Sequence, residues 1–389
     1  LTQQSGMVRI LKKENNVWGK IKDIYSNPTN QGYRRFGWSV SIHGDYLAVG
    51  AYNDNEQTTY AGALYIYNKN EGGTDNWGQV KKIIYNKNEG GLFGYNVKIY
   101  GDYIASSAIS ENSNGSKNGA IYIFKKDYDP LTPNDISSNS WGQLKKLEPS
   151  GLGTNTDARL GASIAMDDNY IIGGSTKMKA WVWKKDYGGT DNWGEIKILE
   201  ESEVVSTSDS YSRLVLEGEP GDAIKIDGDY IIIGAKDSHS GTTSDVGKVY
   251  VYKNNNDNWD EIKILTYDLK AADDNFGHGL SIKDDIIAIG VPGEDTPSSK
   301  SGAIALCYKD EGGVDNWGQI KTLTASDAAT NDELGRNIIM QSGIMVVHAY
   351  GADNLSGSMA NTGALYFFEN NSLTTTSFFN IEARISEYR

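Results

Sequence analysis

The sequence is poor in the residues that form disulfides, catalytic sites and membrane spans. Its 389 residues include one cysteine, Cys307, so no intrachain disulfide is possible, and only 7 prolines and 4 histidines. No apolar run approaches the roughly 18 residues that a bilayer-spanning helix needs. Acidic residues outnumber basic ones by 51 to 37, which gives a net charge of −14. Because nucleic-acid phosphates require a basic surface, we expect no nucleic-acid partner and no membrane insertion.

Glycine and aromatic residues, in contrast, are plentiful, and a repeated unit organises them. The chain has 44 Gly, 24 Tyr and 9 Trp, which suit tight turns and half-buried strands. One unit contains Phe36-Gly37, a core Gly44–Ala51, a run Gly62–Tyr67 and a close Asp75–Lys82. It returns near Phe93, Leu160, Gly221, Phe276 and Leu334, with equivalent tryptophans 52 to 66 residues apart. That period fits one four-stranded blade of a radial β-array.

Each repeat is predicted to form four antiparallel strands, which we name A to D. In the first repeat they span about Phe36–His43, Tyr46–Tyr52, Ala63–Asn68 and Trp77–Ile84. Strand A alternates polar and apolar residues, as a half-buried strand does. Strand B is continuously apolar, as expected when both faces are covered. Strand D mixes lysine and isoleucine, which indicates an outer strand with one wet face.

The number of blades depends on how the two ends of the sequence are interpreted. Six A–B pairs can be identified, in repeats that start near residues 36, 93, 160, 221, 276 and 334. Strands C and D occur seven times if residues 1–24 form a half blade and residues 372–389 a closing strand. Either a seventh A–B pair lies outside this sequence, or the ring has six blades and one half blade is surplus. A third possibility is that the tail is a strand A. We predict an all-β propeller of four-stranded antiparallel blades in one domain, 1–389, with seven blades favoured and six as the alternative.

The units resemble FG-GAP repeats, the modules of the integrin α-subunit head propeller and of many bacterial and algal surface proteins. The resemblance covers nearly the whole chain, and it implies a propeller fold and an extracellular or cell-surface location. The bacterial-type variant, with Gly-Gly-x-Asp-Asn-Trp-Gly, matches better than animal integrins. The residues that carry it are Phe36-Gly37, Phe93-Gly94, Phe276-Gly277, Gly50-Ala51, Gly234-Ala235 and Gly290-Val291-Pro292.

The calcium motif that the resemblance implies, Asp-x-Asp-x-Asp-Gly-x-x-Asp in the A–B loop, does not occur in this sequence. The A–B connections are tight turns with at most two carboxylates, such as Asp227 and Asp229, whereas calcium takes six to eight oxygens. The sequence therefore does not establish any cofactor, and calcium is the one it allows. If calcium binds, B–C or D–A loop carboxylates should hold it; turn capping is the alternative for them. The candidates are Asp273, Asp274, Glu294, Asp295, Asp327 and Asp332.

Other candidate residues are aromatic or carry a modification motif. Tyr52, Tyr60 and Tyr350 lie in loops, where they could stack on sugar rings or simply pack at strand ends. Three asparagines match the N-glycosylation motif, which matters only on a eukaryotic secretory route: Asn114, Asn354 and Asn370. The histidines occupy different repeats, and no HExxH, CxxC or GxSxG occurs, so we predict no catalytic residues and no enzyme.

Constant strands with variable loops are the usual division between a scaffold and its binding site. We therefore expect an extracellular, non-catalytic binding or adhesion module that presents its B–C and D–A loops to a protein or glycan. The alternative is a structural subunit of a surface assembly, such as a filament, sheath or virion, built from copies of the chain. A third hypothesis is an enzyme or lectin that uses the propeller face.

Overall fold

The computed structural model describes residues 6–15, 17–26, 34–56, 59–85, 90–112, 116–129, 140–152, 156–177, 179–200, 202, 223–240, 243–341, 343–353, 361–369 and 381–386. The regular structure of these residues is β-strand. The chain divides into two compact units, Leu1–Leu199 with Leu216–Pro220 and Glu200–Val215 with Gly221–Arg389. Within the described ranges, no helix has the length and apolar character needed to cross a bilayer. A single domain over residues 1–389 stays a prediction.

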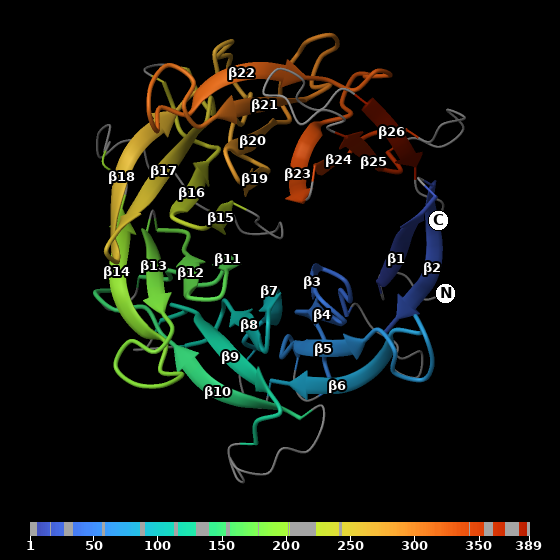
Figure 1. Cartoon of the computed structure of the whole chain (residues 1–389), viewed down its shortest axis with the longest axis vertical. Coiled ribbons are helices and arrows are strands. Elements are labelled where there is room, and N and C mark those ends of the chain that lie inside the picture. Colours follow the sequence, from blue (N-terminus) through green and yellow to red (C-terminus); the bar gives the residue numbers. More distant parts are fainter. Residues whose placement is uncertain are drawn as a thin grey trace. The chain divides into compact units, whose positions relative to one another are not determined.

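The first unit contains, in its described residues, one two-stranded and three four-stranded antiparallel sheets (Figure 1). The two-stranded sheet is β1 (Met7–Glu14) and β2 (Val17–Tyr25). Blade 1 is β3 (Ser39–His43), β4 (Tyr46–Ala51), β5 (Ala63–Asn68) and β6 (Gly78–Ile84). Blade 2 is β7 (Phe93–Tyr100), β8 (Tyr103–Ala108), β9 (Ala120–Lys126) and β10 (Trp141–Leu147). Blade 3 is β11 (Ser163–Met166), β12 (Tyr170–Gly174), β13 (Lys179–Lys184) and β14 (Gly194–Glu200).

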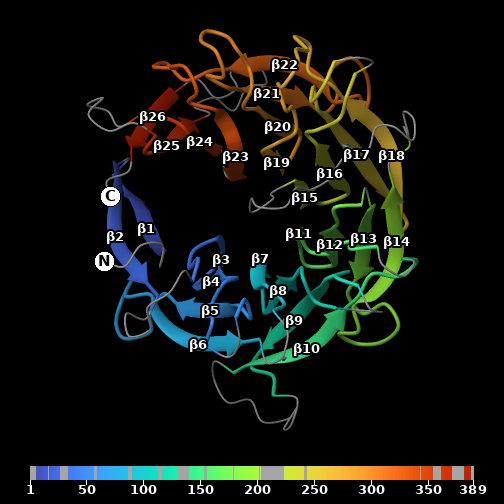
Figure 2. The same cartoon turned by 180° about the vertical axis from the view of Figure 1, so that it is seen from behind.

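The second unit contains three four-stranded sheets in its described residues, each with its strands in chain order (Figure 2). Blade 4 is β15 (Ile224–Asp227), β16 (Tyr230–Ala235), β17 (Lys248–Asn255) and β18 (Asn258–Leu265). Blade 5 is β19 (Leu280–Lys283), β20 (Ile286–Val291), β21 (Ala303–Tyr308) and β22 (Gly318–Leu323). Blade 6 is β23 (Leu334–Gln341), β24 (Ile344–Ala349), β25 (Ala364–Glu369) and β26 (Ile381–Ser386).

These sheets confirm the predicted propeller of four-stranded antiparallel blades. The described residues hold six complete blades, the alternative count, together with a seventh sheet of two strands. The tail strand β26 pairs with β25, so it is the strand D of blade 6 and not a strand A. The pair β1–β2 has the C–D character predicted for it: its bulge at Ile10/Leu11 matches the one at Val251/Tyr252 in blade 4.

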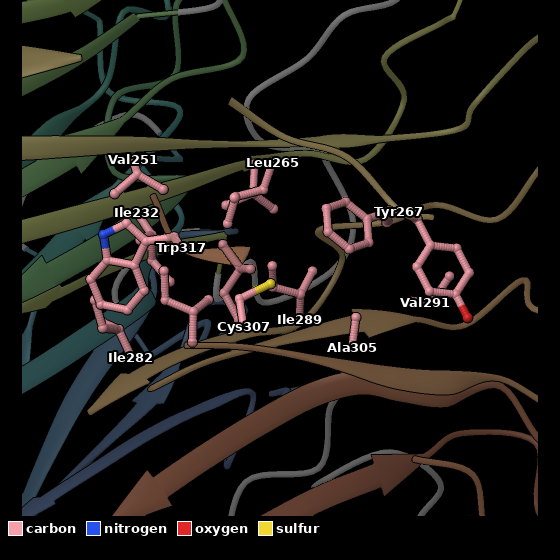
Figure 3. Packing of buried hydrophobic residues seen from close by; sticks show 14 of the residues in the cluster. Ile232, Val251, Leu265, Tyr267, Ile282, Ile289, Val291, Ala305, Cys307 and Trp317 are labelled. Carbon is pink, nitrogen blue, oxygen red and sulfur yellow. The ribbon is translucent and has the colours of Figure 1, made fainter. Parts of the chain in front are cut away.

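Within each unit, neighbouring blades bury apolar faces against one another. Leu280 and Ile282 of β19 share a cluster with Ile232 of β16, and Trp317, fully buried, lies in the same cluster (Figure 3). Cys307 is also buried there, and burial raises the pKa of its thiol to about 12, so it is a packing residue rather than a nucleophile. Hydrophobic contact between sheets therefore dominates the core.

A polar clamp joins certain neighbouring sheets, and it is built from the Asp-Asn-Trp-Gly turns between strands C and D. Each Asp accepts a hydrogen bond from a lysine on strand C of the preceding sheet: Lys12–Asp75 at 2.9 Å, Lys125–Asp191 at 2.6 Å and Lys253–Asp315 at 2.6 Å. Each Asn accepts a hydrogen bond from a lysine on strand D of the preceding sheet: Lys22–Asn76, Lys145–Asn192 and Lys263–Asn316. The sheet β1–β2 thus holds blade 1 as blade 2 holds blade 3 and blade 4 holds blade 5.

Candidate binding surface

An aromatic cluster lies where the D–A and B–C connections of blade 1 meet blade 2. Trp38 precedes β3, Tyr52 follows β4, and Tyr95 comes from β7. The rings of Trp38 and Tyr52 meet edge to face at 4.8 Å between centroids, and Tyr95 lies 5.8 Å from Trp38 and 5.5 Å from Tyr52. The exposed Arg35 places its guanidinium 5.9 Å from the Trp38 ring centroid. We call Arg35, Trp38, Tyr52 and Tyr95 the aromatic patch.

The second unit carries a related pair at equivalent repeat positions. Tyr350 follows β24 as Tyr52 follows β4, and Arg336 stands two residues after Leu334, as Trp38 does after Phe36. The Arg336 guanidinium lies 4.8 Å from the Tyr350 ring centroid, and Tyr350 is 59% exposed. Both units therefore place an arginine against an aromatic ring of these connections: Arg35 against the half-buried Trp38, and Arg336 against the exposed Tyr350.

The third ligand-face candidate, Tyr60, is not among the aromatic contacts described above. Tyr60, predicted as a ligand-face residue, is 54% exposed and closes the B–C loop of blade 1, where its carbonyl accepts from the Leu92 N–H. The glycosylation candidates Asn114, Asn354 and Asn370 fall outside the described residues. Of the sequence-predicted tyrosines, Tyr350 thus lies against an arginine, and Tyr52 lies against Trp38 and Tyr95.

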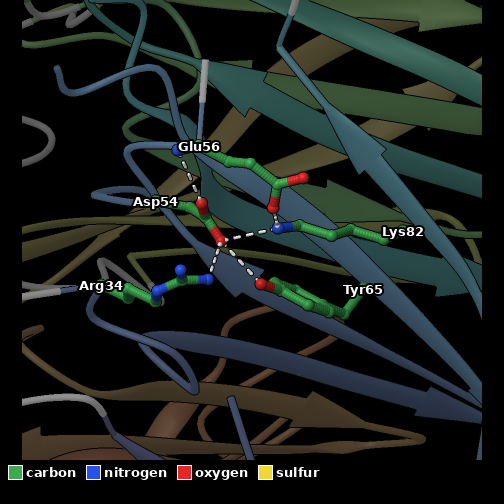
Figure 4. A network of polar contacts seen from close by, with 5 residues as sticks. All are labelled: Arg34, Asp54, Glu56, Tyr65 and Lys82. Atoms are coloured by element: carbon green, nitrogen blue, oxygen red, sulfur yellow. Dashed lines mark hydrogen bonds and ion pairs between the residues drawn. The ribbon is translucent and has the colours of Figure 1, made fainter. Parts of the chain in front are cut away.

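Buried carboxylates anchor the B–C loops behind this surface. Asp54 is fully buried and is held by Arg34 at 3.2 Å, Lys82 at 3.1 Å and the Tyr65 hydroxyl at 2.6 Å (Figure 4). Burial opposes the charge of Asp54, but the hydrogen bonds from Tyr65 and Lys82 outweigh it and lower its pKa. The carboxylate is therefore ionised and fully engaged, which makes this network a structural support for the loop.

Blade 2 repeats that network with a different acid. Glu111 stands three residues after Ala108, as Asp54 does after Ala51, and it is equally buried. It accepts from the Tyr122 hydroxyl at 2.5 Å and pairs with Lys146 at 2.7 Å. Strand C tyrosine and strand D lysine are therefore the usual partners of the buried B–C acid.

Blade 5 keeps the buried acid but replaces its partners. Glu294, 6% exposed, occupies the place of Asp54, whereas Ala305 and Thr322 stand at the places of Tyr65 and Lys82. Asp274, 2% exposed, stands two residues before Phe276, where blade 1 has Arg34 before Phe36.

The Asp274 carboxylate consequently lies in an acidic environment. The Gly293 N–H donates to the Asp274 carbonyl at 3.1 Å, which joins its loop to that of Glu294. Burial, together with the charges of Glu294, Asp295 and Asp273, raises the pKa of Asp274 to about 6, although the Ala271 N–H donates to its carboxylate. Blade 5 therefore has a carboxyl group that holds its proton into the mildly acidic range.

The contribution of Asp274 to stability is expected to fall as the pH rises from about 4 to about 6, because folded Asp274 keeps its proton to a higher pH than the unfolded chain does. At about 1.4 kcal/mol per pKa unit, the rise from 3.8 to about 6 corresponds to roughly 3 kcal/mol. Asp274→Asn removes this charge, so it should stabilise the protein near pH 7.5 by up to that amount and have little effect near pH 4.

Urea unfolding at the two pH values measures this effect. Asp332→Asn is the matched control, because Asp332 has the same place in blade 6 and accepts from the Ala329 N–H, while Ala352 stands where Glu294 would be. A gain for Asp274→Asn that is equal at both pH values would contradict the assignment.

The six calcium candidates do not come together as one site. Asp273, Asp274, Glu294 and Asp295 lie around the blade 5 loops, where Asp295 caps a turn through Ser299 and Lys300. In blade 6, Asp327 accepts from the Tyr366 hydroxyl at 2.8 Å, and Asp332 accepts from Ala329. In the part of the chain that the structure describes, no group of three Asp, Glu, His or Cys side chains is placed to hold a metal ion. Calcium binding by these loops stays a prediction.

The A–B turns do not fit the family's calcium site. The Asp227 carboxylate accepts from Lys283 at 2.9 Å and from the Asp284 N–H at 2.7 Å, so both its oxygens are engaged within the protein. Asp227→Ala is therefore expected to leave any calcium affinity unchanged. Titration calorimetry of the wild type and the variant with calcium tests this, and loss of a binding event in the variant would show a cation site at the turn.

The four histidines lie in different surroundings. His43 packs on the Tyr100 ring at 4.4 Å, and His239 lies 3.7 Å from Asp245. His278 Nδ1 lies 3.0 Å from the Arg336 carbonyl, and His348 contacts Tyr350. These contacts support local packing of the loops and strands, and they bring no two histidines together.

Sequence reasoning missed Trp38, Arg35, Tyr95 and Arg336. The available signal was positional: the residue directly after the Phe-Gly or Leu-Gly pair is Trp38, Tyr95, Ala162, His278 or Arg336 in different blades. This variation inside a constant frame is typical of a binding position rather than a packing position.

Comparison with known proteins places these repeats in a family. Four segments match the FG-GAP repeat family, residues 30–67, 77–124, 259–305 and 317–368, and they cover strands A to C of blades 1, 2, 5 and 6. A search among curated proteins finds no significant match. FG-GAP repeats are typical of extracellular proteins, and propellers built from them are generally non-enzymatic modules of the binding or adhesion type. The matched segments and the four-stranded blades are together consistent with an FG-GAP β-propeller family.

Proposed function

We propose that this propeller is an extracellular, non-catalytic binding module whose working surface is the face formed by the B–C and D–A loops. The observation that carries the proposal is the aromatic patch. It combines residues from two neighbouring blades, and its Tyr52 stands at the start of the loop that the buried Asp54 network holds in place. Binding sites on rigid scaffolds commonly have this construction.

The chemistry of the patch favours a ligand with an apolar face and polar edges. Tryptophan and tyrosine rings stack on such faces, and the Arg35 guanidinium can donate to an adjacent oxygen. A pyranose ring has both features, so a surface glycan is the ligand class that this chemistry supports best. An extended peptide with aromatic side chains is the second ligand class.

The test is binding of the fluorescently labelled protein to arrays of immobilised glycans and extracellular-matrix proteins. Trp38→Ala and Tyr52→Ala should each weaken binding about tenfold or more, as loss of an aromatic anchor does. Tyr187→Ala is the matched control, because Tyr187 is 55% exposed but lies in the C–D turn of blade 3. Circular dichroism establishes that each variant folds. Equal loss in all three variants, or no binding by the wild type to either class, would contradict the proposal.

A second candidate function is that of a structural subunit in a surface assembly. The two-stranded sheet β1–β2 supports it, because the other blades have four strands among the described residues. An assembly would make the size of the particle in solution depend on protein concentration, which light scattering measures.

A further inference from the structure

The buried B–C acids of blades 1 and 2 are each paired with a cation from the chain itself. Asp54 holds the Arg34 guanidinium and the Lys82 ammonium group, and Glu111 holds the Lys146 ammonium group. Lys82 and Lys146 have the same place on strand D, opposite the strand C tyrosine. The place beside the buried acid therefore suits a cationic nitrogen group, which donates hydrogen bonds as well as charge.

Blade 5 has two buried acids at this place and no cation. Glu294 is 6% exposed and Asp274 is 2% exposed, and neither forms an ion pair within the described part of the chain. Backbone groups are the donors that they contact: the Thr296 N–H donates to Glu294, and the Ala271 N–H donates to Asp274. Thr322 stands where blade 1 has its lysine. Because buried carboxylates are costly without a counter-charge, this arrangement favours binding of a cation.

The lysines of the neighbouring loops do not neutralise these acids. Lys270 of the D–A connection and Lys300 of the B–C loop are exposed, and neither pairs with the buried carboxylates among the described residues. Asp273 and Asp295 add further negative charge around Asp274. The electrostatic potential at this place is therefore negative from every loop that surrounds it, and it attracts cations.

A separate observation is the buried hydroxyl of Tyr267. The side chain is 0% exposed, and its hydroxyl makes no hydrogen bond to any residue that the structure describes. Burial and, next, the neighbouring Glu294 carboxylate raise the pKa of this hydroxyl. Its oxygen is directed away from Cys307 and Ile289 of the apolar core (Figure 3). A buried oxygen without a partner, beside two acids without a cation, points to a ligand that donates hydrogen bonds.

We propose that Glu294, Asp274 and Tyr267 form a binding site for one ammonium or guanidinium group of a ligand, the group that lysine and arginine side chains and free polyamines carry. Its N–H groups would donate to the two carboxylates and to the Tyr267 oxygen, which balances the buried charge. The exposed Thr322 marks the direction of entry, because Lys82 reaches Asp54 from that position in blade 1.

A cationic nitrogen group fits these residues better than a metal ion does. Calcium takes six to eight oxygen ligands, whereas this place offers two carboxylates and one hydroxyl. The ammonium group of Lys146 occupies the equivalent place in blade 2. The inference goes beyond the proposed function, because none of its residues belongs to the aromatic patch.

The first probe is n-butylammonium chloride, which has the length and charge of a lysine side chain. Near pH 7.5 it should raise the melting temperature of the whole 389-residue protein in a saturable manner, because a ligand that binds only the folded state stabilises it. Tetramethylammonium chloride has the same charge but no N–H donor, so it should have no saturable effect. Spermidine and the peptide acetyl-Gly-Lys-Gly-amide then distinguish the two sources of the group, since the tighter binder identifies the source.

Variants of the acids locate the site. Glu294→Gln and Asp274→Asn should each weaken the response to butylammonium by about tenfold or more, as loss of one partner of a buried charge pair does. Asp273→Asn is the matched control, because Asp273 is exposed and the change in charge is the same. The response should also weaken below about pH 6, because protonated Asp274 no longer attracts a cation.

A lysine built into the chain provides the complementary test. Thr322→Lys restores the cation of blade 1, so it should raise the melting temperature near pH 7.5 and remove the response to butylammonium. Thr190→Lys is the control, because Thr190 is an exposed residue in the C–D turn of blade 3 and adds the same charge. Trp38→Ala should respond like the wild type, so failure of the loop-face proposal is distinguishable from failure of this one.

Three results would overturn the proposal. The first is a wild-type protein that shows no saturable response to butylammonium, or an equal response to tetramethylammonium. The second is a response that Glu294→Gln and Thr322→Lys both leave unchanged. The third is stabilisation by calcium chloride alone that Glu294→Gln removes, which would assign the acids to a metal ion.

Discussion

Trp193→Ala is expected to lower the free energy of unfolding by about 3–5 kcal/mol, the usual cost of removing a large aromatic side chain from a core. Trp193 is 0% exposed, and its ring packs edge to face against Tyr103 of blade 2 at 5.5 Å between centroids. The residue thus fills the contact between two blades, and its loss leaves a cavity beside the Lys125–Asp191 clamp. Denaturant melts measure the change.

Trp193→Phe separates packing from hydrogen bonding. The Trp193 indole N–H has no hydrogen-bond partner in the described residues, so phenylalanine loses ring volume but no hydrogen bond. Both variants keep the same left-handed backbone, with φ of 50° at this residue. The phenylalanine variant should therefore retain a large part of the lost stability. A cost under about 1 kcal/mol for Trp193→Ala would contradict the blade packing described here.

Asp54→Asn is expected to destabilise the protein by a similar amount, about 3–5 kcal/mol, because it removes the buried anion that pairs with Arg34 and Lys82. The Arg34 side chain is 6% exposed and the Lys82 side chain 17% exposed, so water compensates little. Since the pKa of Asp54 is lowered in the folded state, its contribution is present above the pKa of the unfolded chain and is lost at lower pH.

Glu56→Gln is the control for that network. Glu56 also pairs with Lys82, but its side chain is 42% exposed, and exposed ion pairs contribute about 0–1 kcal/mol. The two acids share one lysine and differ mainly in burial. Equal and small effects of Asp54→Asn and Glu56→Gln in urea melts would show that the network does not support the loop.

The fold could be predicted from the sequence because the same order of strand and turn residues occurs several times along the chain. Strand C of blade 1 was predicted at Ala63–Asn68, which is where β5 lies. Trp77 was placed inside strand D, but β6 begins at Gly78, because the φ of 50° at Trp77 belongs to the turn. The clamp function of Asp75 and Asn76 could not be read from their own repeat, since their lysine partners belong to the preceding sheet.

The candidate site was less predictable, for physical reasons. Tyr52 and Tyr350 were found because tyrosines in loops are conspicuous in a sequence, whereas Trp38 stands next to a core motif and resembles a packing residue. The acids near blade 5 were found as a group, but their roles differ: Asp295 caps a turn, while Asp274 is buried with a raised pKa. Two features distinguish the roles of these acids: how deeply each side chain is buried, and that blade 5 has Thr322 at the position where blade 1 has Lys82.

The central claim is that the loop face of the propeller binds a ligand through the aromatic patch. The most direct measurement is hydrogen–deuterium exchange of the wild type, alone and with the strongest binder from the glycan and matrix-protein arrays. The account predicts slower exchange in the amides around Arg35–Trp38, Tyr52 and Tyr95, with the outer strands D unchanged. Protection confined to strand D edges, or none in the patch at saturating ligand, would contradict it.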